Sequence, residues 1–288
     1  MSASSVCPPE TIPADVGHRL AAAGVEGTPE RVRALSFGKT AVRLGGGAGF
    51  VKLACGPFAV ELARREAAAY AAAPPRPPFT RPELLGFHDG GDWAALWLSS
   101  IDGTPESAWR ALLPCRGPFD GAGATVQPLS VVLDVMVPGN DPSSSAASLR
   151  RLLIEREGDR AIACERAHGD FLYWNVLRRR GAPPTLIDFE HSLSIAPRGH
   201  DRLYWTAVPL LRRAAAMGGA EAAGRAMGLL LRLTAGPHLA ATFLLHLRAR
   251  LEREQAAACR PEDARAHETQ WRARQLELIG HLLRETLR

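Results

Sequence analysis

Aromatic residues and paired cysteines are both scarce in this chain. Only 6% of the 288 residues are Phe, Trp or Tyr, so Leu, Ala and Val must supply most of the core volume. The five cysteines are odd in number and scattered, and none of them belongs to a CxxC pair. The sequence therefore indicates neither a disulfide framework nor a thiolate metal site.

Long apolar runs and targeting segments are also missing. The most apolar stretch, residues 229–247, is interrupted by Arg232, Gly236 and Pro237, which predicts buried helices instead of a membrane span. The first ten residues lack a basic segment followed by an apolar run, so no signal peptide is expected. Together these features predict a soluble, cytoplasmic protein with no membrane span.

The charge balance is moderately basic, and no block of basic residues carries it. A net charge of +5 suits an anionic ligand such as a nucleotide. The sequence has no basic tail, no zinc-finger spacing and no aromatic RNA-binding signature. We therefore interpret the positive charge as a solvated surface and expect no nucleic-acid partner.

The first hundred residues combine strand and helix patterns. Two alternating apolar segments flank the Gly-rich turn 45–49 and predict a hairpin. If its strands are symmetric about the turn, Val42 pairs with Leu53 and Leu44 with Val51, which places these apolar residues on one face. A helix and two more strands are predicted to follow, at residues 58–73, 83–88 and 93–98.

The composition changes near residue 100. Beyond it the pattern is mainly helical, apart from one more hairpin near residues 176–189. We therefore predict an α+β chain with a strand-rich N-terminal lobe, residues 1–100, and a mainly helical C-terminal lobe, residues 101–288. Segment 104–147 is rich in Pro, Gly and Ser, and part of it is expected to be a mobile loop.

Polar side chains that suit a metal-bound phosphate flank the second hairpin. Residues 176–180 and 185–189 are predicted to be its strands, and a turn centred between Gly181 and Ala182 places Asn175 opposite Asp188. Opposed residues on antiparallel strands have Cβ atoms about 4.5–5.5 Å apart. An amide oxygen and a carboxylate at that separation suit Mg²⁺, which prefers oxygen ligands.

Asp170 lies in the loop that enters the same end of this hairpin, five residues before Asn175. From there its carboxylate could take a proton from an attacking hydroxyl. Any one of Asp170, Asn175 and Asp188 alone would be more typical of a turn or a helix cap. Together they indicate a phosphoryl-transfer site, where positioning and charge neutralisation supply most of the catalysis.

The run HGDFLYWN, residues 168–175, followed by Asp188 in Ile-Asp-Phe-Glu, resembles a known signature. It is similar to the HGDxxxxN…(I)D(F/W)E pattern of the aminoglycoside phosphotransferase / choline kinase superfamily, relatives of protein kinases that phosphorylate small molecules. The resemblance implies a bilobal protein-kinase-like fold, with Asp170 as catalytic base and with Asn175 and Asp188 as magnesium ligands. It further implies that His168 braces the loop and that Asp201, which opens a helix in the family, has an architectural role.

An enzyme of this kind needs a lysine on a strand to hold nucleotide phosphates, and a glutamate on the next helix to orient that lysine. Lys52 lies in the predicted strand Val-Lys-Leu, and Glu66 lies in the predicted helix that follows. Glu61 is the alternative on the same helix, but Glu66 better fits the family's pattern. A plain surface ion pair is the other interpretation of these residues.

The nucleotide loop departs from the usual glycine-rich pattern. Segment 36–40 contains one glycine, Gly38, where a GxGxxG would contain three, so Lys39 is expected to hold phosphates in place of backbone N–H groups. A Walker A site is excluded because its first glycine would fall at Arg33. Residues 97–100, which include Trp97 and Ser99, are expected to form the hinge whose backbone contacts the adenine ring. The side chains of this segment do not indicate whether the nucleotide is ATP or GTP.

The sequence thus predicts an ATP- or GTP- and Mg²⁺-dependent phosphotransferase that acts on a hydroxyl of a small molecule. An antibiotic is the first choice of acceptor. A macrolide, nucleoside or modestly charged glycoside fits better than a polycationic aminoglycoside, because residues 104–165 hold no dense acidic cluster. A sugar, choline or other metabolite kinase is the alternative among enzymes, and a nucleotide-binding pseudokinase is the alternative of another class.

Overall fold

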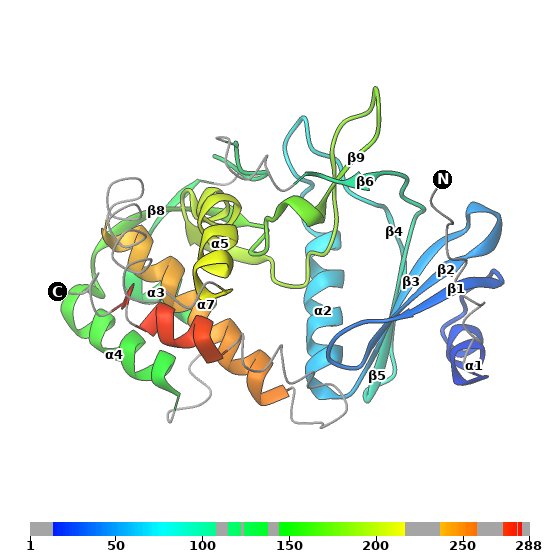
Figure 1. Cartoon of the computed structure of the whole chain (residues 1–288), viewed down its shortest axis with the longest axis horizontal. Coiled ribbons are helices and arrows are strands. Elements are labelled where there is room, and N and C mark those ends of the chain that lie inside the picture. Colours follow the sequence, from blue (N-terminus) through cyan, green and yellow to red (C-terminus); the bar gives the residue numbers. More distant parts are fainter. Residues whose placement is uncertain are drawn as a thin grey trace. The chain divides into compact units, whose positions relative to one another are not determined.

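The computed structural model divides the chain into two compact units (Figure 1). Unit 1 comprises Met1–Ala73 and Arg81–Asp102, and unit 2 comprises Pro74–Thr80 and Gly103–Arg288. The structure describes residues 14–107, 115–121, 124–137, 144–216, 237–257, 273–280 and 282–283. The expectations for residues 1–10, for 108–114, 122–123 and 138–143 of the Pro/Gly/Ser-rich segment and for 229–236 of the apolar stretch lie outside the described residues.

Unit 1 is built on one antiparallel sheet with a helix on each face (Figure 1). Its strands, in spatial order, are β1 (Pro29–Ala34), β2 (Lys39–Leu44), β3 (Gly49–Cys55), β5 (Trp93–Leu98) and β4 (Leu84–Asp89). Helix α1 (Ala14–Ala22) packs on the face formed by the apolar side chains of β2 and β3. Helix α2 (Pro57–Ala71) packs on the opposite face and begins at Pro57, where proline's missing N–H costs no helical hydrogen bond.

The pairing predicted for the β2–β3 hairpin is wrong, although its buried face is right. Val42 pairs with Val51 and Leu44 pairs with Gly49, so the register is shifted by two residues. The shift arises because Gly49 belongs to β3 and not to the turn. A Cβ at Gly49 would lie 2.2 Å from the carbonyl oxygen of Leu98, and its φ is 112°. Because a shift of two preserves the alternation, the predicted apolar residues still share one buried face.

Among the described residues, unit 2 combines helices with two three-stranded sheets. One sheet has the order β10 (Thr185–Leu186), β9 (Val176–Arg178), β6 (Thr104–Pro105), and the other β11 (Leu193–Pro197), β8 (Ala161–Ala167), β7 (Thr125–Pro128). Four of its helices are α3 (Leu129–Met136), α4 (Ser145–Glu157), α5 (His200–Ala216) and α7 (Pro237–Ala257). The α+β prediction is confirmed, but the sheet containing β8 was not anticipated from the sequence.

In the part of the chain that the structure describes, no helix is both long enough and apolar enough to cross a membrane.

Candidate active site

Lys52 and Glu66 form a buried ion pair within unit 1. Lys52 lies in the middle of β3, and its Nζ is 2.8 and 2.9 Å from the two carboxylate oxygens of Glu66 on α2. The side chains are only 14% and 2% exposed, so this is not the surface ion pair that the sequence left open. Glu61, the other candidate on α2, pairs with Arg65 one helical turn away. The structure thus joins Lys52 to the glutamate that the sequence favoured.

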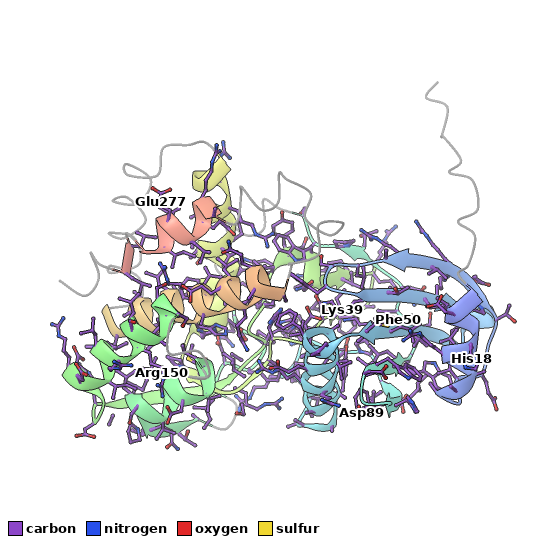
Figure 2. All side chains as sticks on the ribbon, turned by 90° about the horizontal axis from the view of Figure 1, so that it is seen from below. His18, Lys39, Phe50, Asp89, Arg150 and Glu277 are labelled. Atoms are coloured by element: carbon purple, nitrogen blue, oxygen red, sulfur yellow. The ribbon has the colours of Figure 1, made fainter. Side chains whose placement is uncertain are left out.

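The loop between β1 and β2 is a tight turn closed against the end of β3. Gly38 has a φ of 73°, and a Cβ there would lie 2.6 Å from the carbonyl oxygen of Cys55. The Cys55 N–H donates to the Gly38 carbonyl at 3.0 Å. Phe37, also at positive φ, sets its ring edge-on to Phe58. Lys39 is half-buried and begins β2 (Figure 2), so the single glycine is explained by packing, whereas phosphate binding by Lys39 stays a prediction.

The predicted hinge begins inside a strand. Trp97 lies in β5, and its indole N–H donates to the carbonyl of Ala48 at 3.0 Å. Ser99 follows β5 and is tied to Glu83 twice, because its N–H donates to the Glu83 carbonyl and its Oγ accepts from the Glu83 N–H, both at 2.9 Å. A nucleotide base would therefore have to use other backbone groups of this segment.

The pairing predicted between Asn175 and Asp188 is wrong by one residue. Strand β9 pairs with β10 so that Leu177 lies opposite Thr185, which centres the turn on Gly181. Asn175 then faces Ile187, whose N–H donates to the Asn175 carbonyl at 3.0 Å. Both strands also end earlier than predicted, at Arg178 and Leu186, and residues Tyr173–Asn175 form a 3₁₀ turn just before β9.

The structure instead joins Asn175 to Asp170. The Asn175 Nδ2 donates to the Asp170 carbonyl oxygen at 2.9 Å and to Asp170 Oδ2 at 3.0 Å, and both residues are buried. Because both amide hydrogens are used in this way, Asn175 Oδ1 is the atom of the amide that can bind a hard cation. A side-chain amide oriented by its neighbour suits the magnesium ligand that the sequence predicted.

Arg250, which no sequence motif marked, forms an ion pair with Asp170. Its Nη1 is 2.7 Å from Asp170 Oδ1. Burial by itself raises the pKa of Asp170, but the charge of the Arg250 guanidinium and its hydrogen bond oppose burial, and the pKa lies below its usual value. Asp170 is therefore ionised at neutral pH, which is the state that a proton acceptor requires.

His168 braces the loop that carries Asp170. Its Nδ1 accepts from the Asp170 N–H at 3.3 Å, so Nε2 carries the proton and donates to the Ile187 carbonyl at 3.0 Å. Burial lowers the pKa of His168, which keeps the ring neutral. The His168 ring thus connects the Asp170 backbone to Ile187, the residue before Asp188, which is the contact expected of a residue that braces the loop.

Asp188 itself has a strained backbone. Its φ is 68°, in the left-handed region that is uncommon for residues other than Gly but that Asn and Asp adopt more readily than most, and its side chain is half-buried. Its neighbour Phe189 is buried and lies against the ring of His168 at a centroid distance of 4.6 Å. Such strain persists where the surrounding structure imposes it, and it is frequent at functional sites.

Two buried carboxylates hold the backbone around the loop. Asp201, in the first turn of α5, accepts from the N–H groups of His168 and Gly169 at 2.8 and 3.1 Å. Burial raises the pKa of Asp201 to about 7, although these two hydrogen bonds oppose the rise. Glu165 on β8, which the sequence analysis missed, accepts from the N–H groups of Gly121 and Gly199. The architectural role implied for Asp201 matches these contacts.

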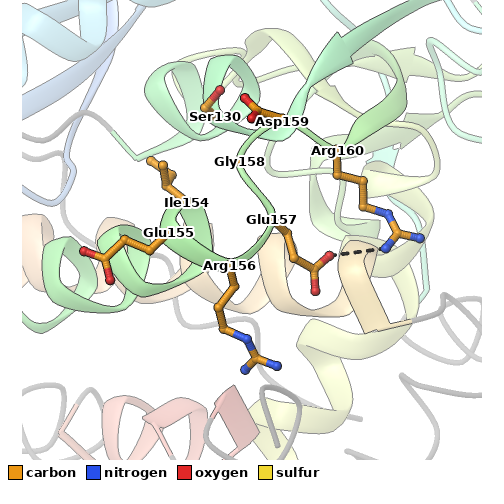
Figure 3. A pocket seen from close by; sticks show the side chains of 8 residues that line it. All are labelled: Ser130, Ile154, Glu155, Arg156, Glu157, Gly158, Asp159 and Arg160. Carbon is orange, nitrogen blue, oxygen red and sulfur yellow. Dashed lines mark hydrogen bonds and ion pairs between the residues drawn. The ribbon is translucent and has the colours of Figure 1, made fainter.

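A surface cavity of about 490 Å³ in unit 2 does not involve these residues. It is lined by Ser130 and residues 154–160, where Glu157 and Arg160 form an ion pair (Figure 3). None of the predicted site residues lines it. The cavity therefore does not identify where an acceptor molecule binds.

His200 makes the fold sensitive to acid. Its ring packs against Tyr204, Phe243 and His246, and neither ring nitrogen has a hydrogen-bond partner among the described residues. Burial lowers the pKa of His200 to about 3. In the unfolded chain this group gains a proton below about pH 6.5, while in the folded chain it stays neutral until about pH 3. The stability that it contributes is therefore complete above pH 6.5 and is lost as the pH falls.

We expect His200→Phe to remove this part of the acid sensitivity, because Phe keeps a ring in the same packing and cannot be protonated. Between pH 7 and pH 5 the unfolding free energy of the wild type should fall by about 2 kcal/mol more than that of the variant. Urea unfolding at the two pH values measures this difference. Equal slopes for the two proteins would show that His200 is not the responsible group.

No protein-family model matches the sequence, and no curated protein matches it either. Solved structures do resemble its fold. One is a thermostable mutant of aminoglycoside phosphotransferase APH(4)-Ia in ternary complex with AMP-PNP and hygromycin B, with 14% identity, a TM-score of 0.55, and coverage of 93% of this chain and 99% of that one. The apo form of a thermostable mutant of the same protein has 11% identity, a TM-score of 0.52 and coverage of 93% and 98%.

A third structure, of APH(4)-Ia itself, has 12% identity and a TM-score of 0.50, and the match covers 93% of this chain and 98% of that one. Identities this low support a conclusion about the fold alone. The chain has the protein-kinase-like α+β fold of the aminoglycoside phosphotransferases, as the resemblance in sequence implied.

Proposed function

We propose that this chain is an ATP- or GTP- and Mg²⁺-dependent phosphotransferase that acts on a hydroxyl of a small molecule. The observation that carries the proposal is the buried pair of Asp170 and Asn175, an ionised carboxylate bonded to an amide in a loop that His168 and Asp201 hold in place. The neighbour of highest TM-score described above supports it, because that structure is a complex with AMP-PNP and hygromycin B.

We propose two oxygen-bearing side chains of unit 2 as the magnesium ligands. Asn175 offers Oδ1, because its nitrogen donates to Asp170, and Asp188 offers a half-buried carboxylate. Hard oxygen ligands of this kind are those that Mg²⁺ prefers, and the ion would neutralise charge on the nucleotide phosphates. In unit 1, Lys52 would hold phosphate oxygens and Glu66 would keep its ammonium group in place.

The chemical step assigned to the protein's own groups is a proton transfer. Asp170 accepts the proton of the acceptor hydroxyl while that oxygen bonds to the γ-phosphorus. The bond from this phosphorus to the β–γ bridging oxygen breaks, and the nucleoside diphosphate leaves. Because little covalent chemistry falls to the protein, holding Asp170 in the correct orientation is its main contribution.

The acceptor we propose is an antibiotic of low positive charge, such as a macrolide, a nucleoside or a modestly charged glycoside. The net charge of +5 and the absence of a dense acidic cluster in residues 104–165 both disfavour a polycation. A sugar, choline or other metabolite kinase is the alternative activity.

A nucleotide-binding pseudokinase is the second candidate, and one observation favours it. Both carboxylate oxygens of Asp170 already have partners, Arg250 and Asn175. Both contacts favour the charged form of the carboxylate and so weaken it as a proton acceptor. Turnover measurements separate the two candidates.

The test is release of nucleoside diphosphate from MgATP and MgGTP with a panel of hydroxylated acceptors that includes these antibiotic classes, sugars and choline. We expect turnover with at least one acceptor, and a loss of at least about 100-fold in Asp188→Ala together with weaker nucleotide binding. Asp159→Ala, which removes an exposed carboxylate elsewhere in unit 2, is the matched control. The enzyme hypothesis would be refuted if no acceptor supported turnover and Asp188→Ala bound nucleotide with unchanged affinity.

A further inference from the structure

The candidate base, Asp170, is held at both carboxylate oxygens by groups of different origin. Asn175 lies five residues away in the same loop and donates to Oδ2 at 3.0 Å. Arg250 lies eighty residues away on α7 and donates from Nη1 to Oδ1 at 2.7 Å. The local motif therefore accounts for only one of the two contacts that fix the carboxylate.

Arg250 is itself fixed from its other side. Its Nε donates to Glu254 Oε1 at 2.7 Å, one turn further along α7. The result is a chain of three charged groups, Asp170, Arg250 and Glu254, whose side chains are 8%, 14% and 10% exposed. The guanidinium spans two carboxylates through two different nitrogens, which sets its plane and its position along α7.

A chain of this kind contributes more to orientation than to stability. Withdrawing three charges from water costs about as much as their mutual attraction returns, so apolar side chains of similar volume would stabilise the fold as well. What apolar side chains cannot do is define the rotamer of Asp170. Because Asp170 is the residue proposed to accept the proton, control of its orientation bears directly on the reaction.

We propose that Arg250 is a positioning residue, which holds the carboxylate of Asp170 in the orientation needed to accept the proton of the acceptor hydroxyl. The inference rests on the proposed phosphotransferase function. Under this proposal the site includes α7, and this helix near the C-terminus is needed for turnover as well as for packing. Lysine cannot replace Arg250, because a single ammonium lacks the planar fork that reaches both Asp170 and Glu254.

The same helix supplies a matched control. Arg248 also pairs with a glutamate one turn along α7, Glu252, at 2.9 Å, and it contacts Ser145 on α4. It makes the same kind of i, i+4 ion pair as Arg250 and has similar burial, but it has no contact with Asp170 among those described. A loss common to both variants would reflect α7 packing, whereas a loss confined to Arg250 reflects its contact with Asp170.

The experiment compares Arg250→Ala, Arg250→Lys and Arg248→Ala by steady-state kinetics with MgATP and an acceptor that the wild type uses. We expect Arg250→Ala to lower kcat by about 100-fold with KM for ATP within about twofold, and Arg250→Lys to recover little of the loss. Millimolar guanidinium chloride should partly restore kcat in Arg250→Ala and should leave Arg248→Ala unchanged. Arg250→Gln, which retains an N–H donor, replaces the alanine variant if that variant does not fold.

The outcomes separate this inference from the proposed function. Absence of wild-type turnover with every acceptor would overturn the proposed function and this inference with it. Wild-type turnover together with an unchanged kcat in folded Arg250→Ala would overturn this inference alone. A lowered kcat that guanidinium does not restore, with an equal loss in Arg248→Ala, would assign Arg250 a purely structural role and would also overturn it.

Discussion

Replacing Asp170 by Asn is expected to lower turnover by about three powers of ten while nucleotide affinity stays within about twofold. A carboxamide has nearly the same shape as the carboxylate but cannot accept the proton of the acceptor hydroxyl. Nucleotide affinity should persist, because Lys52 and the proposed magnesium ligands are unchanged. Initial rates of diphosphate release and nucleotide titration of the same protein samples measure the two effects.

Folding of the Asp170→Asn variant must be checked separately, because the carboxylate also balances the charge of Arg250. Loss of that charge leaves Arg250 with Glu254 as its described carboxylate partner, so a lower melting temperature is expected. Asp159→Asn, on the exposed surface of unit 2, supplies the control for a neutralised carboxylate. Near-normal turnover in a folded Asp170→Asn variant would refute the assignment of this residue as the base.

Breaking the Lys52–Glu66 pair is expected to reduce both stability and activity. Lys52→Met removes the ammonium group that pairs with the Glu66 carboxylate, whose side chain is 2% exposed, and this should lower the unfolding free energy by about 3–5 kcal/mol. Turnover should fall by about 100-fold or more, because the proposed contact with nucleotide phosphates is lost. Urea unfolding and steady-state kinetics of the variant give the two values.

A double variant distinguishes a phosphate-binding lysine from a merely structural ion pair. Lys52→Met combined with Glu66→Met removes both charges and fills the space with apolar groups, so most of the lost stability should return while turnover stays low. Glu61→Gln is the control on α2, because its side chain is 47% exposed and its carboxylate pairs with Arg65. If the double variant regained wild-type turnover, the proposed role of Lys52 in holding phosphates would be excluded.

The sequence correctly predicted which residues of β2 and β3 face the core, because this depends only on the alternation of side chains along a strand. Val42 and Val51 share the buried face of the sheet as expected, because the side-chain period of a strand is two. The pairing failed because the run of glycines looked like one symmetric turn. In the structure Gly49 is a strand residue that lets the carbonyl of Leu98 approach closely, and that requirement comes from β5, far along the chain.

The same limit applied to Asn175 and Asp188. Both were identified as the oxygen-bearing residues of the site from the motif, but their facing arrangement was derived from an assumed turn centre. A displacement of that centre to Gly181 was enough to place Ile187 opposite Asn175. The amide is instead oriented by Asp170, a contact within the motif that spacing alone did not reveal.

The sequence by itself predicted the α+β class and the contact of Lys52 with Glu66 on the helix that follows β3, and it singled out Asp170 and Asn175 of the run HGDFLYWN as candidate site residues. Only the tertiary structure decided what holds the Asp170 carboxylate, which is Asn175 on one oxygen and Arg250 on the other. Sequence motifs and periodicity report only on interactions between residues a few positions apart. An arginine eighty residues away reaches the site only because the chain folds back to place α7 beside the loop, and no local spacing encodes that contact.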